Sequence, residues 1–346
     1  SAKAKKTLKF IKSSKMIINT SAYSRAGLIG NPSDGYYGKT ISIIVKNFNA
    51  EITLYESPNI NIIPNEMDIS TFRSIDELIS DVRKSGYYGG VRLIKATIKR
   101  FGEHCEKYGI NLEKKNFTIE YKTNIPRLVG LAGSSAIITS TLRALMKFYN
   151  VEIPKPIQAN LILSVESKEL GITAGLQDRV QQVYEGIVYM DFNKKIMEKQ
   201  GYGLYEPLDP NLLPPLYIAY KTKLSEVSSI THSNIKDRFN RGNKDVINAM
   251  KTFADIAEEA KKCILKKNHN KLGELINKNF DLRTKIFPIN SANKEMVQCA
   301  RNCGASAKFT GSGGSIIGIF KNEKMYNKLK NELKKIDAVI FKPKII

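Results

Sequence analysis

The sequence predicts an α+β protein of two domains, and three observations support this fold class. The chain has 346 residues, and at ~150 residues per domain this length favours two domains. The first half mixes strand and helix patterns around a glycine-rich loop. The second half runs strand, helices, two strands, helix and strand, an order typical of a ferredoxin-like sandwich with added helices. A proline-dense stretch at 207–215 marks the joint, so we expect domains at 1–206 and 207–346.

The first half is expected to hold strands and helices in alternation. Strands are expected at 40–55, where the alternation favours a hairpin, at 117–123 and at 186–192. Helices are expected where apolar residues recur at helical spacing, at 75–84, 89–109, 134–149 and 156–170. The last of these begins after Pro154 and ends at Gly171.

The second half is expected to form the sandwich. A strand is expected at 215–220, followed by three helical stretches between about 231 and 303. A strand, a glycine turn and a second strand follow at 308–320, then a helix at 323–335 and a last strand at 338–341.

Composition and cysteine count exclude several classes of protein. Hydrophobic residues make up 42% of the chain and aromatic residues 9%, which excludes a disordered, collagen-like or mini-protein chain. The four cysteines are too few and too scattered for a disulfide framework or a zinc ribbon, so we expect reduced thiols. No stretch approaches the ~20 apolar residues of a membrane span. The basic N-terminus lacks the apolar core of a secretory signal, so we expect a cytoplasmic protein without a membrane partner.

The chain is strongly basic, with 55 Lys and Arg against 33 Asp and Glu and a net charge of +22. Such a charge attracts polyanions, either nucleic acid or phosphate-bearing small molecules. The lysines are dispersed, however, and many stand beside asparagine in segments such as 266–271 and 321–335. A compositional bias explains the charge at least as well as a binding surface does.

The most informative segment is 128–145, LVGLAGSSAIITSTLRAL. Gly130 and Gly133 allow positive φ and a close approach to a ligand, while Ser134 and Ser135 stand where the next helix begins. Free N–H groups and the positive end of a helix suit a triphosphate, and a serine hydroxyl there can bind the magnesium that accompanies ATP. An ordinary serine-capped helix explains the residues equally well. The spacing matches neither a P-loop nor a dinucleotide loop.

Two further segments carry charged residues that suit a polar ligand. The turn-rich segment 24–39 holds Arg25, Asn31, Asp34 and Lys39, and a plain cluster of β-turns is the alternative explanation. In the segment 165–184, Glu166 lies on an apolar helix face, where an ionised group needs a metal or an arginine.

Asp178 follows Glu166 within the same segment, after a glycine-bounded turn. Two carboxylates near a phosphate loop suggest one metal ligand and one group beside the nucleophile. Each acid taken alone is more often a salt-bridged surface residue.

A third glycine-rich turn lies at 309–320 and contains Gly311, Gly313 and Gly314. It is either a tight hairpin or a brace for a phosphate or substrate through backbone N–H groups. The three histidines have no metal-binding spacing with one another, and we assign them no role.

Taken together, the glycine segments resemble the GHMP kinase family, which includes galactokinase, homoserine kinase and mevalonate kinase. The matching motifs are RxxLxG at 25–30, GLxGSSA at 130–136 and GSGGS at 311–315. Longer segments, among them RAGLIGNPSDGYYGKTIS and KELGITAGLQDRVQQVYEGIVYMDF, resemble the glucuronokinase branch of this family. The resemblance runs in order from about residue 21 to the C-terminus.

The resemblance implies a fold, a reaction and a cofactor. The fold is a ribosomal protein S5 domain 2-like N-terminal domain, which binds ATP, followed by a ferredoxin-like C-terminal domain. The reaction is transfer of a phosphoryl group from ATP, with Mg²⁺, to an alcohol group of a small molecule. The implied substrate is glucuronate, phosphorylated at its anomeric hydroxyl. The implied partners are therefore a sugar acid and ATP without a specific nucleic acid, and the sequence gives no indication of oligomeric state.

The resemblance also implies roles for single residues. Asp178 matches the catalytic aspartate and Arg25 its cationic companion, while Ser135 and Glu166 match magnesium ligands. Asp34 matches the aspartate with which galactokinases hold their sugar. The implied nucleotide loop comprises Gly130, Leu131, Ala132, Gly133, Ser134, Ser135 and Ala136. The implied substrate-binding residues are Asp34, Asn31, Gly311, Ser312, Gly313 and Arg127.

One departure from the family pattern bears on the substrate. The Glu-His pair that follows the first motif glycine in galactokinase and mevalonate kinase is Asn31-Pro32 here, which argues against galactose and mevalonate. A uronic acid also needs a cation for its carboxylate, and Arg92, Arg127 and Arg179 are candidates.

Three alternative functions remain: a related kinase for another sugar or a mevalonate-like acid, a basic nucleic-acid-binding protein, and a catalytically silent sensor.

Overall fold

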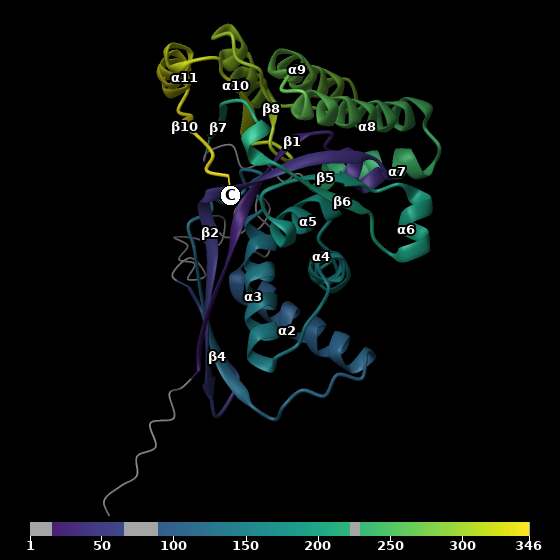
Figure 1. Cartoon of the computed structure of the whole chain (residues 1–346), viewed down its shortest axis with the longest axis vertical. Helices are drawn as coiled ribbons and strands as arrows, with labels where there is room; N and C mark the ends of the chain where they lie inside the picture. Colours follow the sequence, from purple (N-terminus) through teal and green to yellow (C-terminus); the bar gives the residue numbers. More distant parts are fainter. Residues whose placement is uncertain (1–15, 66–88, 222–228, 346) are drawn as a thin grey trace, which may run out of the picture.

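The computed structural model describes residues 16–65, 89–221 and 229–345, which form two β-sheets with helices packed against them (Figure 1). The helix expected at 75–84 lies outside the described residues. Among the described helices, none has both the length and the apolar character that crossing a bilayer requires. All four cysteines are described and free.

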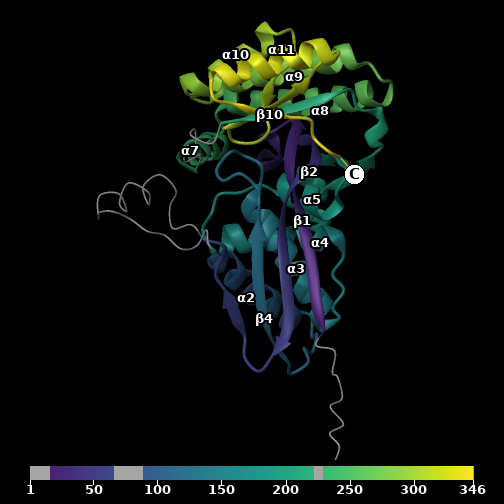
Figure 2. The same ribbon diagram turned by 90° about the vertical axis from the view of Figure 1, so that its left-hand side faces the viewer.

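The first sheet is mainly antiparallel and carries helices on one face (Figures 1 and 2). Its strands are β1 (Ile17–Ile29), β2 (Lys39–Ser57), β3 (Asn61–Ile63), β4 (Asn116–Thr123), β5 (Ile187–Asp191) and β6 (Leu204–Leu208). Their order is β3-β4-β2-β5-β6 with β1 paired to β2, and the β3–β4 pair is parallel. The covering helices are α2 (Gly90–Lys107), α3 (Gly133–Tyr149), α4 (Lys155–Ser164) and α5 (Leu176–Tyr184). Between β5 and β6 lies the short α6 (Lys194–Gln200).

The hairpin expected at 40–55 is wrong, because these residues form the single long strand β2. Residues 39–43 of β2 pair with β5, and residues 50–57 pair with β4. Between these two stretches β2 forms a bulge opposite β1, since Tyr23 pairs with Asn49 while the next residue, Ser24, pairs with Val45. A period of two residues predicts extended backbone but does not say whether the chain reverses.

The second sheet has the order β10-β7-β9-β8 and is antiparallel throughout. Its strands are β7 (Leu216–Tyr220), β8 (Lys308–Phe309), β9 (Ser315–Ile319) and β10 (Val339–Phe341). The helices of this half are α7 (Ser229–Asn240), α8 (Lys244–Leu265), α9 (His269–Ile286), α10 (Ser291–Asn302) and α11 (Glu323–Lys335). Figure 1 shows α8 to α11 gathered at one end of the molecule, above the first sheet.

The expected count of three helical stretches between 231 and 303 is also wrong, because this region contains the four helices α7 to α10. Three of these helices have an asparagine N-cap. Asn243, Asn268 and Asn290 each accept a hydrogen bond from a backbone N–H in the first turn of the helix that follows. Asparagine is a strong N-cap, yet in this lysine- and asparagine-rich chain the caps do not stand out from the background.

Two hydrophobic cores lie against the sheets. In the larger one, Phe117 of β4 meets Phe148 of α3 edge to face, with ring centroids 5.4 Å apart. Each fully buried phenylalanine contributes ~1.5–3 kcal/mol by burial. The smaller core joins the second sheet to α10 and α11 around Tyr217 and Leu329.

The end of β1 joins the two halves of the chain. The N–H of Gly27 donates to the Thr310 carbonyl at 2.7 Å, and Nζ of Lys308 donates to the Gly27 carbonyl at 2.7 Å. Nearby, the N–H of Gly30 donates to Oδ1 of Asn279 on α9 at 2.7 Å. The boundary between residues 206 and 207 stays a prediction, but these bonds bring the first and third glycine motifs together.

Candidate active site

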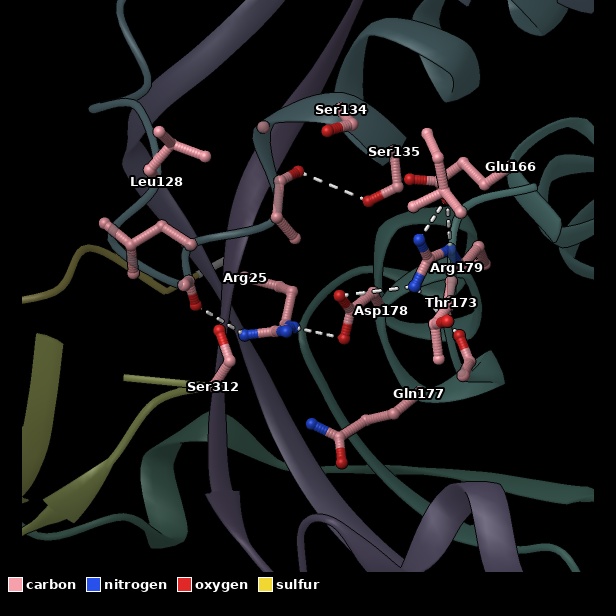
Figure 3. Close-up of a pocket in the computed structure, with 18 of the residues that line it drawn as sticks. Arg25, Leu128, Ser134, Ser135, Glu166, Thr173, Gln177, Asp178, Arg179 and Ser312 are labelled. Carbon is pink, nitrogen blue, oxygen red and sulfur yellow. Dashed lines mark hydrogen bonds and ion pairs between the residues drawn. The ribbon is translucent and has the colours of Figure 1, made fainter. Parts of the chain in front are cut away.

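The three glycine motifs and both predicted acids surround one cavity of roughly 400 Å³ (Figure 3). The predicted residues that line it are Arg25, Asp34, Arg127, Gly130, Leu131, Ala132, Gly133, Ser134, Ser135, Glu166, Asp178, Gly311 and Ser312. Three predicted residues, Asn31, Ala136 and Gly313, do not line it. Asn31 is buried, and its carbonyl accepts a hydrogen bond from Asn279.

The loop before α3 has residues with positive φ and packs closely against the third motif. Gly130 has φ +75°, and a Cβ added there would lie 2.8 Å from the Gly313 carbonyl oxygen. Ala132 adopts the left-handed conformation and is the N-cap of α3, without a side-chain capping bond. The Ser135 hydroxyl donates to the Ala132 carbonyl at 3.3 Å instead of capping the helix. The serine-capped helix is therefore not what forms, and the first turn of α3 offers its N–H groups to a ligand.

Glu166 sits on a π-helical turn, Val165–Glu169, that continues α4. Its Oε2 accepts hydrogen bonds from both Nε, at 2.7 Å, and Nη2 of Arg179. The side chains of Glu166 and Arg179 are only 3% and 6% exposed. π-turns within α-helices occur frequently at functional sites, and here the turn aims a carboxylate into the cavity beside Ser135 (Figure 3).

Asp178 lies in the first turn of α5 between two arginines. Nε of Arg25 donates to its Oδ1 at 2.6 Å, and Nη1 of Arg179 lies 3.3 Å from its Oδ2. Burial opposes ionisation of Asp178, but Arg25 and Arg179 outweigh burial and hold the pKa of this carboxyl below its ordinary value. Asp178 is therefore ionised at neutral pH, and Figure 3 shows it facing Arg25 across the middle of the cavity.

Arg25 is fixed by more than its ion pair. Its Nη1 donates to the Gly130 carbonyl and to the Thr310 carbonyl, both at 2.9 Å. One side chain of β1 therefore ties together the acid on α5, the loop before α3 and the loop after β8. A bidentate, planar guanidinium is suited to this bridging role.

The other two acids of the cavity have raised pKa values. Burial raises the pKa of Glu166 although Arg179 acts against it, and Asp178 adds to the rise. Burial, together with the neighbouring Asp178, raises the pKa of Asp34 to about 6. Oδ2 of Asp34 accepts from the N–H of Gln177 at 3.3 Å, and a Cβ on Gly175 would overlap this carboxylate. The loop before α5 thus needs glycine where it passes Asp34.

The three arginines considered for a substrate carboxylate lie in different places. Arg92 lines a separate cavity beside α2, because its helix places it away from the glycine motifs, so it is no longer a candidate. Arg179 is engaged by Glu166 and Asp178. Arg127 lines the site cavity at the loop before α3 and is exposed.

Sequence reasoning missed two cations that line the cavity and one beside it. Arg283 of α9 is buried and donates to the carbonyls of Gly311 at 3.1 Å and Ser312 at 3.2 Å. Lys236 of α7 lines the cavity next to Asp34. Lys308 is fully buried, and burial lowers its pKa well below the ordinary value. Of these three, Lys308 has a sequence signal, since it lies three residues before Gly311 of the third motif.

Comparison with known proteins places the chain in a family. A family model described as "GHMP kinases N terminal domain" matches residues 92–186, and "GHMP kinases C terminal" matches 260–336. Glucuronokinase 1 of Arabidopsis thaliana is 45% identical over 302 residues, which cover 86% of this chain and 83% of that protein. The chain belongs to the GHMP kinase family. The predicted family and the predicted kinase activity are therefore confirmed, and membership implies the use of ATP.

Other relatives agree with this membership. Probable glucuronokinase 2 of Arabidopsis thaliana is 47% identical over 303 residues, which cover 86% of this GHMP kinase and 82% of that protein. The crystal structure of Lactococcus lactis galactokinase with galactose superposes with a TM-score of 0.76 at 16% identity, over 96% of this chain and 94% of that one. The Methanococcus jannaschii mevalonate kinase structure gives a TM-score of 0.68 at 24% identity, over 97% and 99%. These similarities confirm the predicted two-domain α+β fold.

Proposed function

We propose that this GHMP kinase transfers the γ-phosphoryl group of ATP to the C1 hydroxyl of D-glucuronate, giving D-glucuronate 1-phosphate and ADP. The observation that carries the reaction type is that the Arg25–Asp178 pair and the first turn of α3 open into the same cavity. An anion site and an ionised acid on facing walls suit phosphoryl transfer, which depends mainly on positioning and charge neutralisation. The substrate is proposed from the two relatives named glucuronokinase.

In this mechanism the loop at 130–136 holds the triphosphate through backbone N–H groups. Asp178 accepts a hydrogen bond from the C1 hydroxyl and orients its oxygen in line with the γ-phosphorus. As the new O–P bond forms and the bond to the β-phosphate oxygen breaks, the hydroxyl proton passes to Asp178. Its lowered pKa makes Asp178 a weak base, which is sufficient because the loose transition state needs little proton transfer until bond formation is advanced.

We also propose that Ser135 and Glu166 hold the Mg²⁺ that accompanies ATP. Within the described residues, no group of three or more His, Cys, Asp or Glu could hold a metal by itself. Magnesium in kinases is usually bound by one or two protein groups together with phosphates and water, so one hydroxyl and one carboxylate fit this ion. Arg179 engages only Oε2 of Glu166 in the observed ion pair. The ion would neutralise charge on the phosphates.

The remaining predicted residues would hold the sugar acid. Asp34 lies beside Asp178 at the cavity wall and would accept hydrogen bonds from sugar hydroxyls. Gly311 and Ser312 line the cavity, whereas Asn31 and Gly313 do not and would act by shaping it. Arg127, which lines the cavity and is exposed, would also contact the substrate.

A kinase assay against a panel of acceptors tests the proposed function. The purified full-length chain, with ATP and Mg²⁺, is assayed with D-glucuronate, D-galacturonate, D-glucose, D-galactose and mevalonate. We expect the highest kcat/KM with D-glucuronate and a phosphorus NMR signal of an anomeric phosphate ester. Preference for a hexose or mevalonate, or phosphate on another hydroxyl, would refute the proposal. ATP-independent RNA binding that falls steeply with salt, without turnover, would instead favour the nucleic-acid alternative.

A further inference from the structure

A uronate carries a full negative charge at C6, remote from the C1 hydroxyl that reacts. A carboxylate brought into a partly buried cavity needs a cation or several donors to replace its lost water. Among the residues that the structure describes, five cationic side chains line the cavity: Arg25, Arg127, Arg179, Lys236 and Arg283. Their existing partners decide which of them is available to the sugar acid.

Three of the five are already engaged within the protein. Arg25 and Arg179 form the ion pairs with Asp178 and Glu166. Arg283 donates hydrogen bonds from its two terminal nitrogens to the carbonyls of Gly311 and Ser312. Its guanidinium also lies over the rings of Phe287 and Phe309. Turning any of these groups toward a ligand would break contacts that shape the site itself.

Lys236 is differently placed, because it forms no ion pair with a carboxylate in the described part of the chain. Its ammonium donates to the Gly35 carbonyl at 2.5 Å and lies over the Tyr36 ring, 4.9 Å from the centroid. An ammonium has three donors, so the bond to Gly35 leaves capacity for a ligand.

The helix that carries Lys236 is anchored where the sugar is expected to bind. Ile235 is 2% exposed and packs in a core with Tyr36 and Phe253 of α8. Phe239, one turn further along α7, meets the Tyr36 ring edge to face with centroids 5.0 Å apart. Tyr36 closes the 3₁₀ turn Ser33–Tyr36, which also contains Asp34. Lys236 is thus fixed over the turn that presents Asp34 to the cavity.

We propose that Lys236 binds the carboxylate of the sugar acid and so determines that this kinase prefers a uronate over the neutral hexose. This inference rests on the proposed function and adds a residue from the C-terminal half to the sugar site. Asp34 would hold hydroxyls while Lys236, which Asp34 attracts electrostatically, holds the acid group. The negative Asp34 and the positive Lys236 would then recognise the hydroxyls and the carboxylate of the substrate, respectively.

Arg127 is the competing cation, since it also lines the cavity. It stands directly before Leu128 in the loop that leads to α3. Figure 3 shows Leu128 and Gln177 on opposite sides of the Arg25–Asp178 pair, and it is Gln177 whose N–H donates to Asp34. Lys236, by contrast, donates a hydrogen bond to Gly35 in the turn that contains Asp34.

A comparison of D-glucuronate with its neutral amide, D-glucuronamide, tests the inference. In the wild-type protein we expect kcat/KM to be about 10- to 100-fold higher for the acid, as a charge-assisted hydrogen bond provides. In Lys236→Met the acid should lose about 10- to 100-fold, the amide should change by less than about threefold, and the preference should vanish. Lys236→Arg should restore most of it, because the positive charge remains.

Arg238→Met is the matched control, since it removes a cation from the same helix at a residue that does not line the cavity. It should keep the wild-type preference, and thermal melting of every variant checks that the fold is intact. If Lys236→Met keeps the preference for the acid, or if Arg127→Met abolishes it while Lys236→Met does not, the inference is overturned. If the wild-type protein does not phosphorylate D-glucuronate at all, the proposed function fails first and the inference fails with it.

Discussion

Replacing Arg179 by methionine should destabilise the fold strongly, because it leaves Glu166 buried without its partner. The Arg179 and Glu166 side chains are 6% and 3% exposed, so this is a buried ion pair. Removing one partner of a buried ion pair lowers the free energy of unfolding by ~3–5 kcal/mol. An exposed pair would be worth ~0–1 kcal/mol. Against a total stability of about 5–15 kcal/mol, the expected loss is a large fraction.

Urea unfolding followed by far-ultraviolet circular dichroism measures the loss, and it needs no tryptophan, which the chain lacks. Arg100→Met is the control, because it loses an ion pair with Glu103, whose side chains are 27% and 41% exposed, and a hydrogen bond to the Ser164 hydroxyl. It leaves no charge buried, so the loss should be at most ~1–2 kcal/mol. Adding Glu166→Gln to Arg179→Met should recover part of the stability, since no unpaired charge is then buried.

The loss should also depend on pH. In Arg179→Met, burial acts on Glu166 without an opposing cation, so its pKa in the folded state lies above its ordinary value of 4.5. A carboxyl with a raised folded-state pKa binds its proton more tightly when folded, so stability falls as pH rises. The destabilisation should be smaller near pH 5 than near pH 8. A loss below ~1 kcal/mol, or one that grows on acidification, would refute the reasoning.

Two further predictions concern the cavity walls. Because the pKa of Asp34 is about 6 in the folded protein, a pH profile of kcat/KM should rise through about pH 6 as this acid ionises, and Asp34→Asn should flatten the rise. The same shift means that ionisation disfavours the folded state, so Asp34→Asn should gain up to ~3 kcal/mol over wild type as pH rises from about 3.8 to about 6, measured by urea unfolding. Gly130→Ala should lose ~1–3 kcal/mol and raise the KM for ATP, since φ is +75° and the Cβ would meet the Gly313 carbonyl at 2.8 Å. Gly133→Ala, whose Cβ would meet nothing nearer than 3.5 Å, should not destabilise in the same unfolding assay, and equal losses in the two variants would contradict this account.

The motif residues could be predicted from the sequence because their signals are local. Gly130 and Gly133 precede a helix, and the segment around Asp178 resembles one family along its whole length. The strand β2 and the four helices α7 to α10 were harder, since periodicity gives the type of element but not where the chain turns. The bulge of β2 opposite Tyr23 and Ser24, and the asparagine caps, determine these features.

The partners of the site residues could not be predicted in the same way. Arg179 is a sequence-based candidate for the substrate carboxylate, whereas in the fold the π-turn brings Glu166 onto it. Arg283 and Lys236 reach the cavity from α9 and α7, more than 50 residues from any glycine motif but the third. Their positions depend on how the two halves of the chain pack together. Local sequence patterns within either half do not predict this packing.

The most direct test of the central claim is phosphoryl transfer by Asp178→Asn. The account holds that this carboxylate, ionised by Arg25, orients the reacting hydroxyl within a site that binds both substrates. We expect kcat with D-glucuronate to fall by about 10²- to 10⁴-fold, while the thermal stabilisation by a non-hydrolysable ATP analogue with Mg²⁺ stays near the wild-type value. Turnover close to that of the wild type would contradict the account.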